Sequence, residues 1–140
     1  MESVSVSRQI DGSIESISSA IHDVKPFMKA AGFDEVIVDG STIRVANQVG
    51  PIHIELTLKI RDVDGAALFY EQIDGIFDAM TTVYVISETT VGTSVNATTR
   101  FALDAAVVGS VLDAVVIKRQ RRKELAAQLD YLQDHCGSDD

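Results

Sequence analysis

Three histidines are the side chains best suited to acid–base or metal chemistry at neutral pH, but they lie far apart in the sequence, at His22, His53 and His135. An imidazole acts as a base or binds a metal only where partners hold it in place. His53 falls on the polar side of its segment, so a surface position is expected for it. The sequence also lacks a phosphate-binding glycine loop, a nucleophile elbow and a helical histidine pair at metal spacing. We therefore predict no catalytic residue, no metal site and no cofactor.

Two further motifs are better explained by local structure than by chemistry. Asp62 and Asp64 precede Gly65 as at the start of a calcium-binding loop, but the other ligands of such a loop are missing. A hairpin turn is expected there instead. Cys136 has no activating neighbour beyond His135, and the end of a chain is a poor place to hold a nucleophile.

A basic run between residues 118 and 123 holds five of the twelve Lys and Arg residues. Such a run can bind an anionic ligand, a phosphate or an acidic partner protein. It can equally be the solvated part of a helix whose charges pair with nearby acids. Arg119 and Arg122 lie close to the line of apolar residues in this segment, where an arginine can hold a carboxylate or phosphate bidentately. We therefore include Arg119 among the candidate ligand-binding residues.

The rest of the chain is acidic, which excludes several classes of partner. Asp and Glu number 21 against 12 Lys and Arg, a formal net charge of −9. Such a surface repels nucleic acid and anionic lipid, so neither is an expected partner. No apolar run reaches the roughly 20 residues that span a bilayer, so no stable membrane insertion is expected. Asp outnumbers Glu by 14 to 7, a pattern typical of salt-adapted (halophilic) proteins, with an ordinary acidic cytosolic protein as the alternative.

Length and cysteine content indicate one cytoplasmic domain. The chain has 140 residues, of which 46% are hydrophobic, enough for one core. We expect residues 1–136 to form a single domain and residues 137–140 a disordered tail. The first residues lack the charged and apolar regions of a signal peptide. A single cysteine forms no internal disulfide, so a cytoplasmic location is expected.

The middle of the chain is predicted to consist of short strands joined by glycine turns. Ile54, Leu56 and Leu58 fall on one face of the clearest strand, with His53 and Glu55 on the other. Asp-Gly and Gly-Pro pairs separate the segments. An antiparallel meander with one buried face is the natural interpretation. The predicted strands cover residues 3–10, 35–38, 42–48, 52–61, 67–73, 79–88 and 94–103.

Helical periodicity marks the regions before and after this meander. Ser13 is placed to cap a helix with apolar positions from Ile14 to Val24, and Pro26 is expected to break or kink it before a short turn over residues 27–31. One long helix is expected from Asp104 to about His135. Its apolar stripe comprises Val108, Val111, Leu112, Val115, Leu125, Leu129 and Leu132. The element order predicts an α+β domain whose strands curl around the final helix.

Several segments resemble the SRPBCC superfamily, which includes START lipid-transfer domains, pollen-allergen-like proteins and polyketide cyclases. They are HDVKPFMKAAG at residues 22–32, VGPIHIELTLKIRDVDG at residues 49–65, Gly92-Thr93 and Val108-Gly109. The resemblance implies the helix-grip fold, a bent antiparallel sheet wrapped around a long C-terminal helix. The branch that it resembles most is typified by the G subunit of carbon monoxide dehydrogenase. This chain has EQIDGIFDAM where that branch often carries a Gly-rich stretch, so the function of that branch is not carried over.

Strands that curl around a helix enclose either a cavity or a dry core. Phe27 and Met28 are candidates for a lid over it, and Tyr70 and Tyr84 for hydroxyl groups that orient a ligand. Core packing is the alternative role for each candidate. The apolar residues expected to face inward are Ile54, Leu56, Leu58, Phe101, Val108, Leu112 and Val115.

These features together favour binding of a hydrophobic or amphipathic small molecule, without catalysis. One alternative is an enzyme of the polyketide-cyclase or dehydratase type, in which Tyr70, Tyr84 or His53 performs acid–base work. Another is an accessory protein that docks to a redox enzyme. A homodimer or a partner enzyme is left open.

Overall fold

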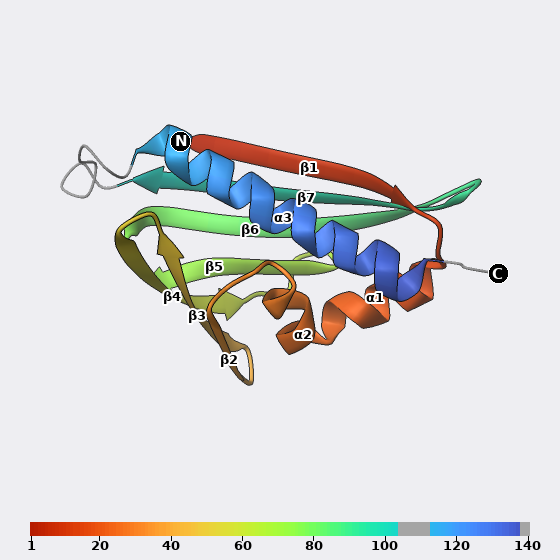
Figure 1. Ribbon diagram of the computed structural model, residues 1–140. Helices are drawn as coiled ribbons and strands as arrows, with labels where there is room; N and C mark the ends of the chain where they lie inside the picture. Colours follow the sequence, from red (N-terminus) through yellow and green to blue (C-terminus); the bar gives the residue numbers. More distant parts are fainter. Residues whose placement is uncertain (104–112, 138–140) are drawn as a thin grey trace.

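The structure is a computed structural model, which describes residues 1–103 and 113–137. One sheet contains seven strands in the order β1-β7-β6-β5-β4-β3-β2. The sheet bends towards the β2 end, and α3 crosses the face on which α1 and α2 also lie (Figure 1). The elements in chain order are β1 (Glu2–Ile10), α1 (Ile14–His22), α2 (Val24–Lys29), β2 (Glu35–Asp39), β3 (Thr42–Val49), β4 (Ile52–Ile60), β5 (Leu68–Asp74), β6 (Phe77–Thr89), β7 (Gly92–Leu103) and α3 (Ala114–Cys136).

The sheet follows the predicted meander, with every neighbouring pair of strands antiparallel. Alternation of side chains gives β7 one buried face, on which Val95, Ala97 and Thr99 are each fully buried. Gly40 turns β2 into β3 with φ of 60°, a conformation that L side chains rarely adopt. The predicted α+β class, a curved antiparallel sheet wrapped around a C-terminal helix, is confirmed.

The break between the first two helices differs from the prediction. α1 ends at His22 and α2 begins at Val24, so the chain breaks at Asp23 and not at Pro26. Pro26 lies in the first turn of α2. Its missing backbone N–H costs little there, because amides in the first turn of a helix have no carbonyl partner within that helix. The first amide of α2 to bond within this turn is that of Phe27, which donates to the carbonyl of Asp23 at 3.2 Å.

The final helix begins later than predicted. Asp113 has extended backbone angles, φ −130° and ψ 177°, and its carboxylate accepts a hydrogen bond from the amide of Val116. An aspartate in this position is an N-cap. α3 therefore starts at Ala114 rather than near Asp104. Val108 and Leu112, which the prediction placed on this helix, lie outside the described residues.

α3 runs alongside β1 in the same direction. Lys118 pairs with Glu2 at 3.6 Å, and about three helical turns further along Asp130 pairs with Arg8. Near the end of the helix, Gly12 lies so close that a Cβ there would be 2.5 Å from the carbonyl oxygen of Cys136. These contacts hold α3 over the sheet and fix which of its residues face inward.

Two of the predictions concern the C-terminus and the membrane. Of the expected tail at residues 137–140, the structure describes Gly137 alone. No helix within residues 1–103 and 113–137 combines the length and the hydropathy needed to cross a bilayer.

Candidate functional site

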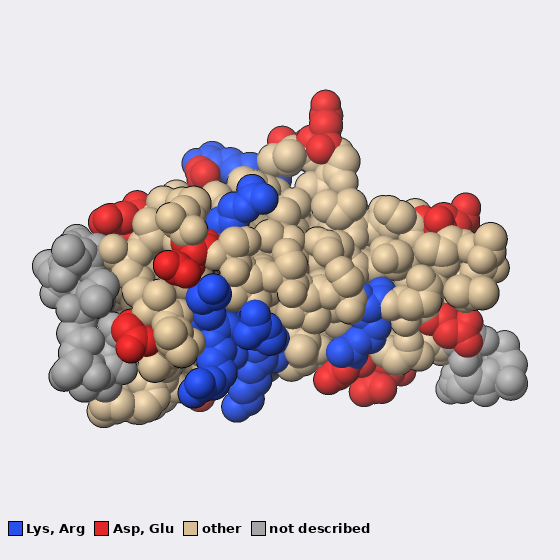
Figure 2. All heavy atoms as spheres, turned by 90° about the horizontal axis from the view of Figure 1, so that it is seen from above, with Lys and Arg blue, Asp and Glu red and all other residues tan. Residues whose placement is uncertain are grey.

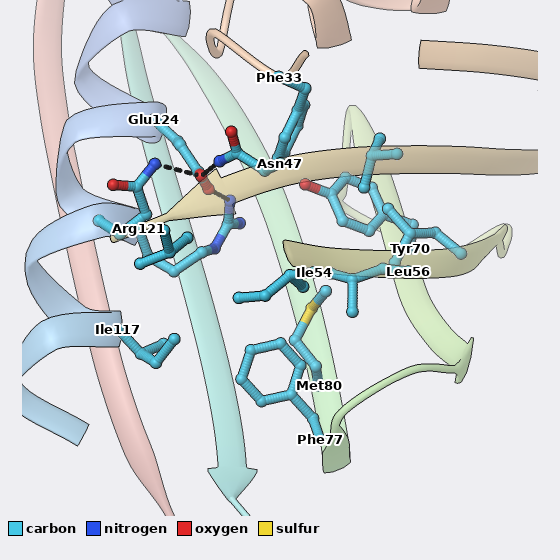
Figure 3. Close-up of a pocket in the computed structure, with 14 residues that line it drawn as sticks. Phe33, Asn47, Ile54, Leu56, Tyr70, Phe77, Met80, Ile117, Arg121 and Glu124 are labelled. Carbon is cyan, nitrogen blue, oxygen red and sulfur yellow. Dashed lines mark hydrogen bonds and ion pairs between the residues drawn. The ribbon is translucent and has the colours of Figure 1, made fainter. Parts of the chain in front are cut away.

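A narrow pocket lies between α3 and the curled strands β3 to β6 (Figure 3). Its cavity volume is about 30 Å³, which is room for roughly two water molecules. Phe33, Leu56 and Gln120 are half-buried lining residues and mark the side on which the pocket opens. The apolar lining consists of Phe33, Val45, Val49, Ile54, Leu56, Leu58, Phe77, Met80 and Ile117.

One end of this apolar pocket carries a buried ion pair. Arg121 and Glu124 are one helical turn apart on α3, and Nη1 of the arginine lies 2.6 Å from Oε1 of the glutamate. Their side chains are only 8% and 4% exposed. Such charges pay a large desolvation cost, which pairing and hydrogen bonding must offset. The structure meets that need for the carboxylate in full.

Glu124 accepts three hydrogen bonds on its two oxygens. Besides the arginine, Asn47 and Gln120 each donate an amide N–H to Oε2 at 2.9 Å. A carboxylate that serves only as an acceptor is in its ionised form. Asn47 belongs to β3, so this network ties the curled end of the sheet to the helix (Figure 3).

Arg121 is less fully satisfied than its partner. Its Nη2 donates to the hydroxyl of Thr82 on β6 at 3.1 Å. Its Nε is buried and is the one buried side-chain nitrogen or oxygen without a hydrogen-bond partner among the described residues. Figure 3 shows the side chain reaching from α3 into the space between helix and sheet. An unpaired buried N–H is costly, which is why native proteins rarely keep one.

The arginine stays charged in this position. Burial on its own lowers the pKa of Arg121, but the neighbouring Tyr70, Glu124 and Tyr84 together raise that pKa above its ordinary value. A permanent positive charge and an unpaired N–H donor therefore belong to a residue that lines the pocket.

A second hydrogen-bonded chain lies behind the pocket. The hydroxyl of Tyr84 donates to Oε1 of Gln128 at 2.6 Å and lies 3.3 Å from the hydroxyl of Tyr70. Gln128 in turn donates to the backbone carbonyl of Phe27 at 3.2 Å. Because the proton of Tyr84 is directed to Gln128, Tyr70 is left to donate to Tyr84 and keeps its own oxygen free to accept. Burial, followed by the nearby Tyr70, raises the pKa of Tyr84 well above 10.0, so this hydroxyl stays neutral.

Three of the predicted site residues meet at the pocket. Ile54, Leu56 and Tyr70 line it, together with Leu58. Tyr84 is fully buried and contacts Tyr70 from behind, with ring centroids 6.2 Å apart, but it does not line the pocket.

Other predicted residues lie elsewhere. Phe27 and Met28 are fully buried and form part of the core rather than a movable lid, since Phe27 packs edge-on against Tyr84 at 5.1 Å. Phe101 is buried beneath Phe77, with centroids 5.3 Å apart. Val115 is 63% exposed and turns away from the pocket.

Arg119 is exposed as well. With Lys118, Arg122 and Lys123 it belongs to the outer side of α3, and Figure 2 shows Lys and Arg side chains grouped over part of this face of the molecule. This placement matches the solvated alternative for the basic run. His53 likewise lies on the surface, 3.3 Å from Glu55.

The sequence prediction missed the buried arginine, although the pattern contained a signal for it. Counting forward from Val115 led to Arg119 and Arg122. Counting backward from Leu125 in steps of four gives Arg121 and then Ile117, which are the residues that face the pocket. Because the helix begins only at Ala114, its C-terminal leucines are the correct reference for its inner face.

Comparison with known proteins shows a similarity of fold and no closer relationship. No protein-family model matches the sequence, and no curated protein matches it. Among solved structures, TTHA0849 from Thermus thermophilus is similar with a TM-score of 0.75 and 17% identity over 96% of both chains. A START superfamily protein from Mycobacterium smegmatis has a TM-score of 0.73 and 13% identity, again over 96% of both chains. The Zhui aromatase/cyclase from Streptomyces sp. R1128 has a TM-score of 0.73 and 15% identity over 94% of this chain and 93% of that one.

These likenesses confirm the helix-grip fold. The branch typified by the G subunit of carbon monoxide dehydrogenase stays a prediction.

Proposed function

We propose that this protein binds a small, mostly apolar molecule in the pocket between α3 and the curled sheet. The observation that carries the proposal is the buried Nε of Arg121, a donor without a protein partner among the described residues, at the polar end of a mostly apolar pocket. A ligand that fills the pocket and accepts from this nitrogen would remove the cost of the unpaired group. The START-like and aromatase/cyclase structures of the same fold support a ligand-binding role.

The ligand has to widen the pocket in order to enter. A volume of about 30 Å³ is far below the several hundred Å³ typical of small-molecule sites. Met80 is the lining side chain best able to move, because it is unbranched and has three rotatable bonds. Phe33 and Gln120 at the open side are partly exposed and are not held by tight packing on all sides.

The test compares two variants of the same helix. Ile117→Phe adds bulk to a 3% exposed lining residue, whereas Val115→Phe adds a comparable side chain at a 63% exposed position two residues away. Binding is measured with an environment-sensitive apolar dye and by native mass spectrometry of gently purified protein. We expect Ile117→Phe to lower dye affinity at least tenfold and Val115→Phe to leave it unchanged. Equal affinities for both variants, in proteins that still unfold cooperatively, would reject the pocket as the binding site.

A cyclase-like enzyme is the second candidate, favoured by two polar residues that line the same pocket. Arg121 Nε can stabilise negative charge on a carbonyl oxygen, and the hydroxyl of Tyr70 can exchange a proton nearby. Ring closure would form a carbon–carbon bond between two carbons of one polyketone chain, with a proton moving from carbon to oxygen. The neutral Tyr84 is a poor base for that step. Conversion of a linear polyketone, followed by mass spectrometry and chromatography, tests this candidate, and Tyr70→Phe must lower the rate if it is correct.

A further inference from the structure

We propose that the pocket selects an uncharged ligand, whose carbonyl-type oxygen accepts from Arg121 Nε, and that it discriminates against carboxylates and other anions. This inference rests on the proposed function and specifies the class of molecule that the same pocket takes. The sequence alone predicts a different ligand, a carboxylate or phosphate held bidentately by Arg119 or Arg122.

The balance of charge at the polar end is the first argument. Among the lining residues, Arg121 and Glu124 are the two that carry charge, and their charges cancel within an ion pair of 2.6 Å. An anionic ligand would enter as a third buried charge without a countercharge. Burying such a charge in a site with little water is strongly unfavourable.

The hydrogen-bonding capacity is the second argument. Glu124 already holds Nη1 of the arginine, and Thr82 holds Nη2. Both terminal nitrogens therefore already have a partner, whereas Nε has none among the described residues. One donor matches one carbonyl oxygen, whereas a carboxylate needs partners for two oxygens.

The hydroxyl of Tyr70 in the lining also disfavours an anionic ligand. Tyr70 lines the pocket and directs its proton towards Tyr84 at 3.3 Å, so its oxygen keeps only the capacity to accept. An acceptor repels a ligand carboxylate and tolerates an uncharged ketone, amide or hydroxyl. Asn47 and Gln120 give their amide N–H groups to Glu124 and add no free donor.

The experiment uses three probes that share one ring: acetophenone, benzoate and ethylbenzene. Their binding to the full chain at neutral pH is followed by amide chemical shifts in ¹⁵N-labelled protein. We expect acetophenone to bind at least tenfold more tightly than benzoate, and more tightly than ethylbenzene, which lacks the acceptor. From about pH 7 to about pH 6, the apparent affinity for benzoate should rise about tenfold, because only benzoic acid is neutral.

Two variants locate the effect. Glu124→Gln removes the countercharge and should raise the affinity for benzoate at least tenfold, reducing or reversing the preference for the ketone. Glu55→Gln makes the same change of net charge on the surface, where the side chain is 76% exposed, and should leave the preference unchanged. If Glu124→Gln does not fold, the affinities of the unaltered protein for the three probes, and the pH dependence of benzoate binding, still test the preference for an uncharged ligand.

The outcomes separate the two proposals. If benzoate binds as tightly as acetophenone, or more tightly, the inference on ligand charge is wrong while the binding pocket stands. If all three probes and the apolar dye fail to bind, the proposed function itself is wrong. An equal gain in benzoate affinity from Glu124→Gln and Glu55→Gln would show an effect of overall charge and would also overturn the inference.

Discussion

Arg121 and Glu124 bring opposite charges into the interior, so each depends on the other. Both side chains are at most 8% exposed, and water reaches neither well enough to replace the partner. Replacing both members of such a pair by apolar residues is often tolerated, whereas removing one member leaves an uncompensated charge. A single substitution in this pair is therefore expected to cost more stability than the double substitution.

We expect Arg121→Met to lower the free energy of unfolding by about 3–5 kcal/mol. The double variant Arg121→Met/Glu124→Leu should be more stable than this single variant, because no charge is left buried without a partner. Urea unfolding measures both. Arg119→Met is the control, since Arg119 is exposed on the same helix and its loss should change stability by less than about 0.5 kcal/mol. A double variant less stable than Arg121→Met would contradict the interpretation.

Tyr84 makes stability depend on pH in the alkaline range. Burial and the nearby Tyr70 raise its pKa in the folded protein above the 10.0 of an unperturbed tyrosine. The unfolded chain therefore releases this proton at a lower pH than the folded one does. Stability from this group is fully present below about pH 10 and falls as the pH rises towards the folded pKa, by at most about 1.4 kcal/mol per pH unit.

The measurement is urea unfolding in steps from neutral to alkaline pH, with Tyr84→Phe as the comparison. The variant should lose about 1–3 kcal/mol at neutral pH, because Oε1 of Gln128 loses its donor. It should also show a shallower decline above about pH 10 than the unaltered protein. Parallel declines in the two proteins would mean that Tyr84 does not titrate as described.

At the scale of elements, the start of α3 decides which of its residues face the sheet. Asp113 has an extended backbone, and its carboxylate caps the amide of Val116 at 3.0 Å. The helix that follows places Ile117, Arg121 and Glu124 on its inner side. A start one residue later or earlier would still give a helix, but the cap favours the observed one.

Asp113→Ala should lower the free energy of unfolding by about 1 kcal/mol, because the first turn of α3 loses its side-chain acceptor. Urea unfolding followed by circular dichroism checks this. Asp113→Ser is the matched control, since serine caps nearly as well and should restore most of the loss. Equal stability of the alanine and serine variants would show that the cap contributes nothing.

The elements were more predictable from the sequence than the site was. The strand predicted over residues 52–61 starts where β4 starts and ends one residue beyond it, because period-two alternation is a local property of the sequence. The beginning of α3 was not predictable in this way, since the apolar residues before Asp113 continue a helical pattern without a break. The role of Arg121 was missed for the same reason. Its burial depends on Thr82, Glu124 and Asn47, two of which come from strands far away in the chain.

For the molecule as a whole, the net charge of −9 disfavours the compact state through repulsion between carboxylates. Salt screens that repulsion, since the Debye length falls to about 3 Å at 1 M ionic strength. We expect the thermal unfolding midpoint to rise from dilute buffer to molar KCl, as for a salt-adapted protein.

A variant with less charge provides the control for this prediction. Asp62→Asn/Asp64→Asn/Asp78→Asn changes three exposed carboxylates and brings the net charge from −9 to −6. Its midpoint should depend less steeply on KCl than that of the unaltered protein. A midpoint that is no higher in molar KCl than in dilute buffer would reject salt adaptation.

The contact between β1 and α3 has a consequence for how the protein is made. Arg8 and Asp130 are 122 residues apart in sequence, and most of the sheet is synthesised between them. Until α3 has left the ribosome, the inner face of the sheet, with Leu58 and Phe101, lacks the helix that covers it in the folded protein. Until then the nascent chain exposes the apolar strand residues that α3 covers, and this part of the core closes only once α3 has been made. During that interval the carboxylates of neighbouring nascent chains repel one another.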